Sequence, residues 1–156
     1  HGGSIRVGVS ASQAQEAVKN SVLELIKLER ECLTQKAFDA LRIRVDEAAA
    51  GLKDLLKSTS GKVIGYGAPA KLTTLMYQFK LQAADFAYIV DDSPWKQGLF
   101  TPGMHIPVVS SSQLQNPSDR PTRIVIFAWN FADSIVAKFP EYAGKFITPL
   151  PILKEL

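Results

Sequence analysis

Residues 61–75, GKVIGYGAPAKLTTL, constrain the fold more than any other stretch of this chain. A short apolar run is followed at once by Gly65 and Gly67, and glycine lets the backbone turn sharply because it has no Cβ atom. Pro69 suits the first turn of a helix, where its missing N–H costs nothing. The stretch therefore predicts a strand, a tight turn and a helix.

The spacing Gly65-x-Gly67-x-x-Ala70 fits the phosphate-binding turn of nucleotide-binding α/β folds. In those folds, free N–H groups and the positive end of a helix dipole face a diphosphate. A glycine turn without any ligand is the alternative interpretation. A lysine one turn into the helix can reach a phosphate, although it can equally be a solvent-exposed side chain. The candidate binding residues of this stretch are Gly65, Tyr66, Gly67, Ala68 and Lys71.

Length and composition favour one ordinary globular domain: the chain has 156 residues, of which 46% are apolar and 21% charged. No apolar run approaches the ~20 residues of a membrane span, and the net charge of +3 is dispersed, so we expect neither a membrane nor a nucleic-acid partner. Cys32 is the only cysteine, which excludes an internal disulfide and favours a cytoplasmic protein. The chain begins with His1 rather than Met, so we expect a fragment of a larger protein; a tag remnant ahead of a complete domain is the alternative.

The first part of the chain, residues 1–60, predicts a strand followed by two amphipathic helices. Apolar residues alternate with others over residues 4–9, the period of a half-buried strand. From about Ser12, apolar residues recur at helical spacing as far as a break at residues 34–36. We expect this helical pair to pack against the following sheet or a neighbouring domain. A second stripe comprises Phe38, Leu41, Val45, Ala48, Leu52 and Leu55, with Gly61 as the helix terminator.

Residues 61–156 alternate strands with helices after the glycine turn. This order indicates an α/β fold with a mostly parallel sheet and helices on both faces. Pro107 in the segment 105–109 suits an edge strand, and Ser110 or Ser111 can cap a short helix after it. The further strands are expected at 86–90, 105–109, 123–128 and 145–148, and the helices from the turn to about Lys80 and over 131–139.

Ligands of open α/β sheets bind beyond the carboxyl ends of the strands, and several polar or aromatic residues fall at such ends here. Asp91 or Asp92 lies about 20 residues beyond the glycines, where a dinucleotide fold places its ribose-binding acid; a turn or helix cap is the alternative. Trp95 and Trp129 can stack on a base or sugar, or close a core or interface. The candidate substrate-binding residues added here are Asp91, Lys96, His105, Trp129 and Asn130.

No catalytic set and no metal-ligand spacing emerges from the sequence. His1 and His105 are the only histidines, and the position of His105 near a glycine and a proline favours a loop-ordering role over that of a base. Asp91 and Asp92 without further ligands make a poor metal site. We therefore expect a binding domain with no catalytic residue and no metal of its own.

Five blocks together resemble a known family. They are HGGSIRV, GYGAPAK, VDDSPWKQGLFTPGMHIPV, IFAWNFADSI and GKFITPLP, which span nearly the whole chain in order. The chain resembles the C-terminal domain of S-adenosylmethionine-dependent sugar C-methyltransferases, which methylate a nucleotide-linked keto-deoxysugar on carbon. Residues that match the family pattern are Lys71, Asp91, Pro94, Lys96, Gly98, Pro102, Gly103, His105, Trp129 and Asn130.

The resemblance implies a parent protein with an N-terminal zinc domain, a central S-adenosylmethionine domain and this Rossmann-like third domain. Catalytic residues and both cofactors would belong to the missing domains, and the nucleotide-diphosphate sugar would lie between this chain and the methyl-donor domain. Leu72 and Thr73 depart from the glycine and asparagine common in the family, so any contact of that asparagine does not carry over. Met104 likewise replaces a common threonine.

Three functions remain open at this point. The resemblance favours a substrate-binding and interface domain of a C-methyltransferase, which would be inactive as an isolated fragment. The spacing of Gly65, Gly67 and Asp91 also fits a regulatory or redox module that binds NAD(P). The apolar stripe between Phe38 and Leu55 fits a purely structural docking domain.

Overall fold

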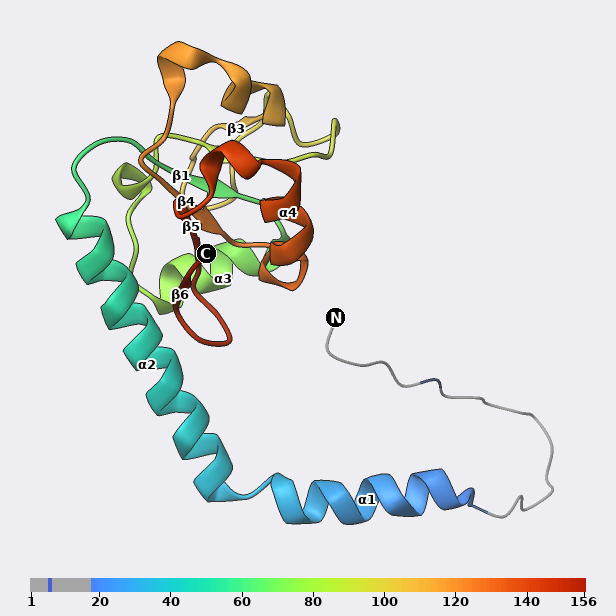
Figure 1. Ribbon diagram of the computed structural model, residues 1–156. Coiled ribbons are helices and arrows are strands. Elements are labelled where there is room, and N and C mark those ends of the chain that lie inside the picture. Colours follow the sequence, from blue (N-terminus) through green and yellow to red (C-terminus); the bar gives the residue numbers. More distant parts are fainter. Residues whose placement is uncertain (1–5, 7–17) are drawn as a thin grey trace. The chain divides into compact units, whose positions relative to one another are not determined.

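The computed structural model describes Arg6 and residues 18–156 (Figure 1). The chain divides into two compact units, residues 1–42 and 43–156, with the boundary inside a helix. The strand predicted over residues 4–9 and the predicted helix start near Ser12 lie outside the described residues.

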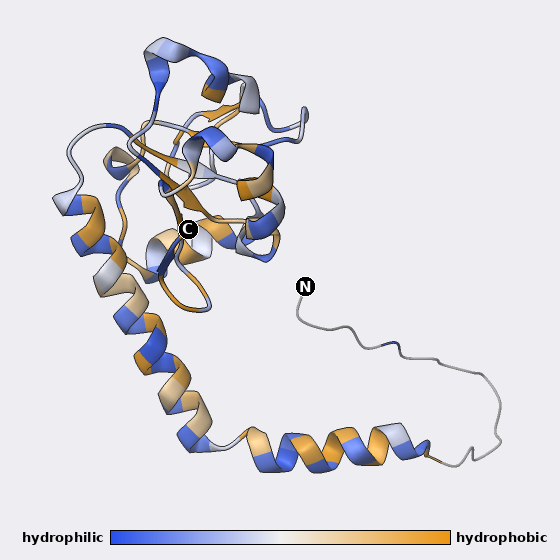
Figure 2. Ribbon diagram, viewed as in Figure 1, coloured by the Kyte–Doolittle hydropathy of each residue, from blue (hydrophilic) through white to orange (hydrophobic). Residues whose placement is uncertain are grey.

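The first unit contains α1 (Asn20–Cys32) and the beginning of α2 (Gln35–Ser58). The predicted break between the helices is confirmed, and the Thr34 hydroxyl accepts a hydrogen bond from the Ala37 N–H at 3.2 Å. Apolar and polar residues alternate around α1 in Figure 2, but α1 buries none of its residues. Phe38 and Leu41, in the first turns of α2, are exposed as well.

The second unit is built around a six-stranded sheet with the order β3-β2-β1-β4-β5-β6. The pairs among the first five strands are parallel, and β6 runs antiparallel to β5. This arrangement confirms the predicted mostly parallel α/β sheet, with β3 at one edge. The strands are β1 (Val63–Tyr66), β2 (Ile89–Val90), β3 (Val108–Val109), β4 (Arg123–Ile126), β5 (Phe146–Thr148) and β6 (Lys154–Glu155).

Alternate residues of the central strands point to opposite faces of the sheet, as the two-residue period of a strand requires. Val125 of β4 packs into one apolar cluster, whereas Ile124 and Ile126 pack into the other. The C-terminal half of α2 and α3 (Ala70–Gln78) covers the first cluster, and α4 (Ala132–Lys138) the second. The prediction of helices on both faces is therefore confirmed.

The stripe of α2 divides into a buried and an exposed part. Ala48 and Leu52 are buried in the core, and Val45 and Leu55 pack beside them. The sheet therefore accounts for the C-terminal half of the stripe, whereas the apolar residues before Ile43 remain exposed.

Short 3-10 helices connect the larger elements. Ser110 caps the first turn after β3, where its hydroxyl accepts a hydrogen bond from the Ser112 N–H at 3.3 Å, as the sequence predicted. The antiparallel β6 was not predicted, because its two residues carry no apolar alternation. The 3-10 helices are η1 (Ala83–Asp85), η2 (Ser111–Gln115), η3 (Pro117–Asp119), η4 (Trp129–Phe131) and η5 (Pro140–Tyr142).

Candidate functional site

The glycine turn joins β1 to α3 at the carboxyl edge of the sheet, and its glycines are required by packing. Gly67 has φ +92°, a conformation that residues with a Cβ atom rarely adopt, and a Cβ there would lie 2.6 Å from that of Ala128. A Cβ on Gly65 would lie 2.6 Å from the Phe127 ring, which packs in the core. Packing alone therefore explains why both positions are glycine, without any bound ligand.

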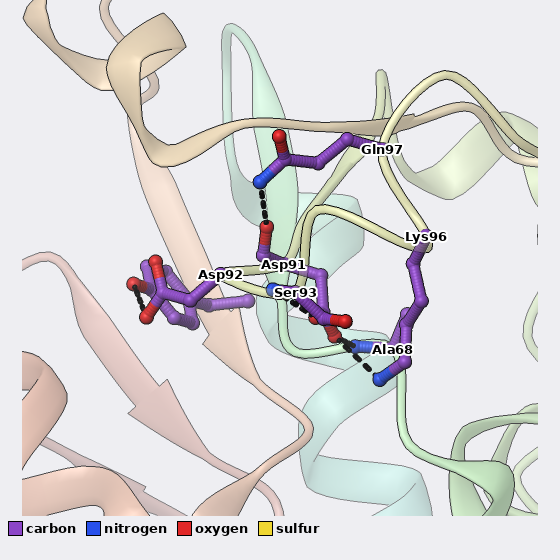
Figure 3. Close-up of polar contacts among 7 residues, drawn as sticks. Ala68, Asp91, Asp92, Ser93, Lys96 and Gln97 are labelled. Atoms are coloured by element: carbon purple, nitrogen blue, oxygen red, sulfur yellow. Dashed lines mark hydrogen bonds and ion pairs between the residues drawn. The ribbon is translucent and has the colours of Figure 1, made fainter.

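Asp91 follows β2 and is the centre of a hydrogen-bond network at this edge (Figure 3). Asp91 is only 7% exposed, and its Oδ2 accepts a hydrogen bond from the backbone N–H of Ala68 at 2.7 Å. The Lys96 ammonium donates to the same oxygen at 3.1 Å, and the Ser93 N–H donates to Oδ1 at 2.9 Å. A buried carboxylate needs such donors, and this network supplies three of them to Asp91.

This network changes the interpretation of the turn. In a dinucleotide site, the turn N–H groups face a diphosphate and the acid after the next strand faces a ribose. Here the Asp91 carboxylate itself binds the turn N–H of Ala68. The two groups expected to hold separate parts of a nucleotide are instead bonded to each other.

Asp92 points to a second, more exposed cluster. Its Oδ2 accepts the phenol O–H of Tyr66 at 2.9 Å, and its Oδ1 accepts from the Lys138 ammonium at 2.9 Å. Burial raises the pKa of Asp92, but hydrogen bonds from Lys138, Tyr66 and Ser111 outweigh it, so the pKa lies below its ordinary value. Burial, followed by the hydrogen bond to Asp92, raises the pKa of Tyr66, so the phenol stays protonated and is held as a donor.

A pocket of about 260 Å³ opens between these clusters. It is lined by residues at the carboxyl ends of β1 and β2, in the loop after β2 and in α4. These segments meet at the carboxyl ends of the parallel strands. The carboxylates of Asp91 and Asp92 accept from Lys96 and Lys138, so two negative charges are matched by two positive ones. The lining residues are Tyr66, Gly67, Pro69, Asp91, Asp92, Lys96, Ala128, Phe131 and Ile135.

A larger hollow of about 350 Å³ includes Lys53 and Lys57 of α2 and Lys80 after α3. None of the strand-end residues lines it. Ligands of open α/β sheets bind at the carboxyl ends of the strands, so the smaller pocket is the better candidate site.

Lys71 and Trp129 contact each other, and neither residue lines the pocket. The Lys71 ammonium lies 3.7 Å from the centroid of the Trp129 ring, which packs beside the core. Burial lowers the pKa of Lys71. The structure thus places this predicted pair in a cation–π contact between the start of α3 and η4.

Two other predicted residues do not line the pocket. His105 precedes β3, whereas Asp91 follows the parallel strand β2, so the two residues lie at opposite ends of this strand pair. His105 is exposed, has φ +54° and lies with its ring 5.8 Å from that of Phe100. Asn130 is exposed in η4. The structure brings together Tyr66, Gly67, Asp91 and Lys96 of the predicted set, with Ala68 in the adjoining turn. Gly65, which was predicted in the turn, lies within β1 and pairs with Ile89 and Val125.

Besides Pro69, Asp92 and Ala128, three further residues of the pocket region were outside the predicted set of site residues. Lys138 bonds to Asp92 across 46 positions of sequence, and no local pattern connects them. Phe131 and Ile135 were assigned only to a helix. The sequence placed that helix directly after a strand, and the first turns of such helices lie beside the carboxyl ends of the strands. That position could have predicted that Phe131 and Ile135 line the pocket.

The described residues contain no group of three or more His, Cys, Asp and Glu that could hold a metal ion. Within the same part of the chain, no helix has both the length and the apolar character needed to cross a membrane. The zinc and S-adenosylmethionine implied by the resemblance therefore remain predictions about other parts of a parent protein.

Comparison with known proteins gives two matches. The family model described as "C-methyltransferase C-terminal domain" matches residues 1–151. The chain is also similar to the C-methyltransferase NovU of Streptomyces niveus, with 30% identity over 159 residues that cover 97% of this chain and 37% of that protein. The chain thus spans little more than a third of its relative. A family match over nearly the full length shows that this chain belongs to the C-methyltransferase C-terminal domain family.

Proposed function

We propose that this chain forms the substrate-binding and interface part of an S-adenosylmethionine-dependent C-methyltransferase that acts on a nucleotide-linked keto-deoxysugar. The observation that carries the proposal is a pocket at the carboxyl edge of the sheet in a member of the C-methyltransferase C-terminal domain family. The methyl donor would bind to a separate domain of the parent protein. The 37% coverage of the relative leaves room for such a domain.

The charges of the pocket favour the sugar over the diphosphate as the group that enters it. Its carboxylates are already matched by ammonium groups, and the turn N–H of Ala68 is bonded to Asp91, so little positive potential remains for a diphosphate. Asp92 has a side chain that is 50% exposed, and a carboxylate can accept more bonds than the two from Tyr66 and Lys138. Asp92 is therefore the acceptor best placed for a sugar hydroxyl.

Isothermal titration of the 156-residue chain tests this function. The ligands are a pyrimidine-nucleoside-diphosphate-linked keto-deoxysugar and S-adenosylmethionine, added separately. We expect the sugar nucleotide to bind and Asp92→Ala to weaken its binding about tenfold, the effect of one hydrogen bond to a charged group. Lys57→Gln is the control, because Lys57 lies outside the pocket lining, and should leave the affinity unchanged. Binding of the methyl donor without the sugar nucleotide would contradict the proposal.

The same titration includes NADH and NADPH, because an NAD(P)-binding module is the alternative function. That function requires Asp91 to face ribose hydroxyls, whereas the carboxylate is buried and bonded to Ala68, Ser93 and Lys96. We therefore expect no nicotinamide-cofactor binding. Micromolar binding of either cofactor, with none of the sugar nucleotide, would favour the alternative.

A further inference from the structure

Trp95 is the most exposed large apolar residue among those described, with 89% of its surface open to solvent. Tryptophan is usually mostly buried, because its large ring gains much from leaving water. Nothing in the described part of the chain covers this ring, although the residue lies directly before Lys96 of the pocket. The exposed indole, one residue before the pocket-lining Lys96, is therefore accessible to a ligand.

The backbone that carries Trp95 is held in place. The Lys96 N–H donates to the Ser93 carbonyl at 3.1 Å and closes a turn in which Pro94 and Trp95 are the central residues. A proline in the first central position restricts that turn further. The ring is thus presented by a fixed turn, which lowers the entropy lost when a partner binds it.

Asp91 connects this turn to the pocket. Its carboxylate accepts from the Ser93 N–H at 2.9 Å and from the Lys96 ammonium at 3.1 Å, and its carbonyl accepts from the Gln97 side chain at 2.9 Å (Figure 3). Asp91 and Lys96 also line the pocket. One buried residue therefore sets the position of both the pocket wall and the turn that carries the exposed ring.

The pocket is too small for a whole nucleotide sugar. Its volume of about 260 Å³ lies below the range of about 300–1,000 Å³ typical of sites that enclose a drug-sized ligand. A ligand with a sugar, a diphosphate and a base must therefore extend beyond the rim. Aromatic side chains bind the exposed face of a nucleobase by stacking, whatever the base.

We propose that Trp95 stacks on the base of the nucleotide while the sugar occupies the pocket at Asp92. This assignment rests on the proposed function and names a contact that the family match does not. The class of ligand recognised by Trp95 is a planar nucleobase joined to a sugar through a diphosphate. The indole contributes affinity for the base and makes no contribution to holding the sugar.

Two ligands separate these contributions: a pyrimidine-nucleoside-diphosphate-linked keto-deoxysugar and the corresponding sugar phosphate, which lacks the base. Trp95→Ala should weaken binding of the first by about 5- to 100-fold, the range for loss of one stacked base, and leave binding of the second unchanged. Trp95→Phe keeps an aromatic ring and should lose less. Leu99→Ala is the matched control, since Leu99 is an exposed apolar residue of the same loop, and should bind both ligands as the wild-type chain does.

Fluorescence gives a second readout. The chain has two tryptophans, so Trp129→Phe leaves Trp95 as the sole tryptophan. The base-bearing ligand should then quench the tryptophan emission. Three results would each overturn the stacking assignment while leaving the proposed function intact. They are wild-type affinity in Trp95→Ala, equal losses of affinity for both ligands, and unchanged Trp95 emission when the base-bearing ligand saturates the chain. If the wild-type chain binds no sugar nucleotide, the proposed function fails and the assignment fails with it.

Discussion

The backbone N–H of Ala68 donates a hydrogen bond to Oδ2 of Asp91 across 2.7 Å, and this bond ties the turn after β1 to the end of β2. The glycine turn and the acid after the next strand are thereby parts of one rigid edge. The carboxylate occupies a donor that a phosphate-binding turn would leave free. This turn therefore has one free backbone donor fewer than a phosphate-binding turn would offer.

Asp91→Ala should lower the free energy of unfolding by about 2–4 kcal/mol, because it removes the acceptor of several hydrogen bonds at a buried position. Urea unfolding followed by circular dichroism measures the loss. Asp54→Ala, which removes an exposed carboxylate from α2, should stay within about 0.5 kcal/mol of wild type. Equal stability of the two variants would show that the Asp91 network contributes nothing to folding.

Gly67→Ala should destabilise the chain by about 2–4 kcal/mol, because it adds both backbone strain at φ +92° and a clash with Ala128. Gly98→Ala is a matched control: its φ is +79°, but a Cβ there would have nothing within 4 Å. The control should lose only about 1–2 kcal/mol, the strain alone. Thermal unfolding of both variants separates crowding from strain, and equal losses would refute the crowding.

The stabilising effect of Asp92 should decrease at acid pH. Its pKa in the folded chain lies below the unfolded value, so its stabilisation is complete above the unfolded pKa, about 3.9, and is lost as the pH falls through the folded pKa. The difference in melting temperature between wild type and Asp92→Asn should therefore be constant near neutral pH and shrink below about pH 4.

Lys138→Met tests the cause of this pH dependence. It removes one of the donors that lower the pKa of Asp92, so the folded pKa rises toward the unfolded value. The decline should still begin near the unfolded pKa, but it should be smaller and end at a higher pH than in wild type. The check is the same series of melting curves. An unchanged midpoint in Lys138→Met would mean that the ammonium does not stabilise the carboxylate.

Leu52→Ala should cost about 2–5 kcal/mol of unfolding free energy, because Leu52 is fully buried where α2 packs on the sheet. Leu41→Ala alters the same helix at a residue that is 50% exposed, and its effect should stay below about 1 kcal/mol. Denaturant midpoints give both values. Comparable losses would mean that the N-terminal half of α2 is also packed in the folded chain.

Local patterns in the sequence determined most of the fold. The spacing of apolar residues and the glycines between the segments predicted the parallel strands and the helices on both faces, because each element must bury its own apolar side. The strand over 86–90 is shorter than predicted, since only Ile89 and Val90 form a ladder. The two residues of β6 were missed because their strand character comes from pairing with β5 and not from their own side chains.

The sequence by itself determined that glycines, acids and aromatics would gather at the carboxyl ends of the strands, since topology carries every parallel strand to the same edge. The tertiary structure alone decided which of these groups bond to one another. Ala68 and Asp91 are 23 positions apart, and Tyr66 and Asp92 are 26 apart. Hydrogen bonds over such separations depend on the register of β1 against β2, and that register is fixed by packing of the whole sheet rather than by any local pattern.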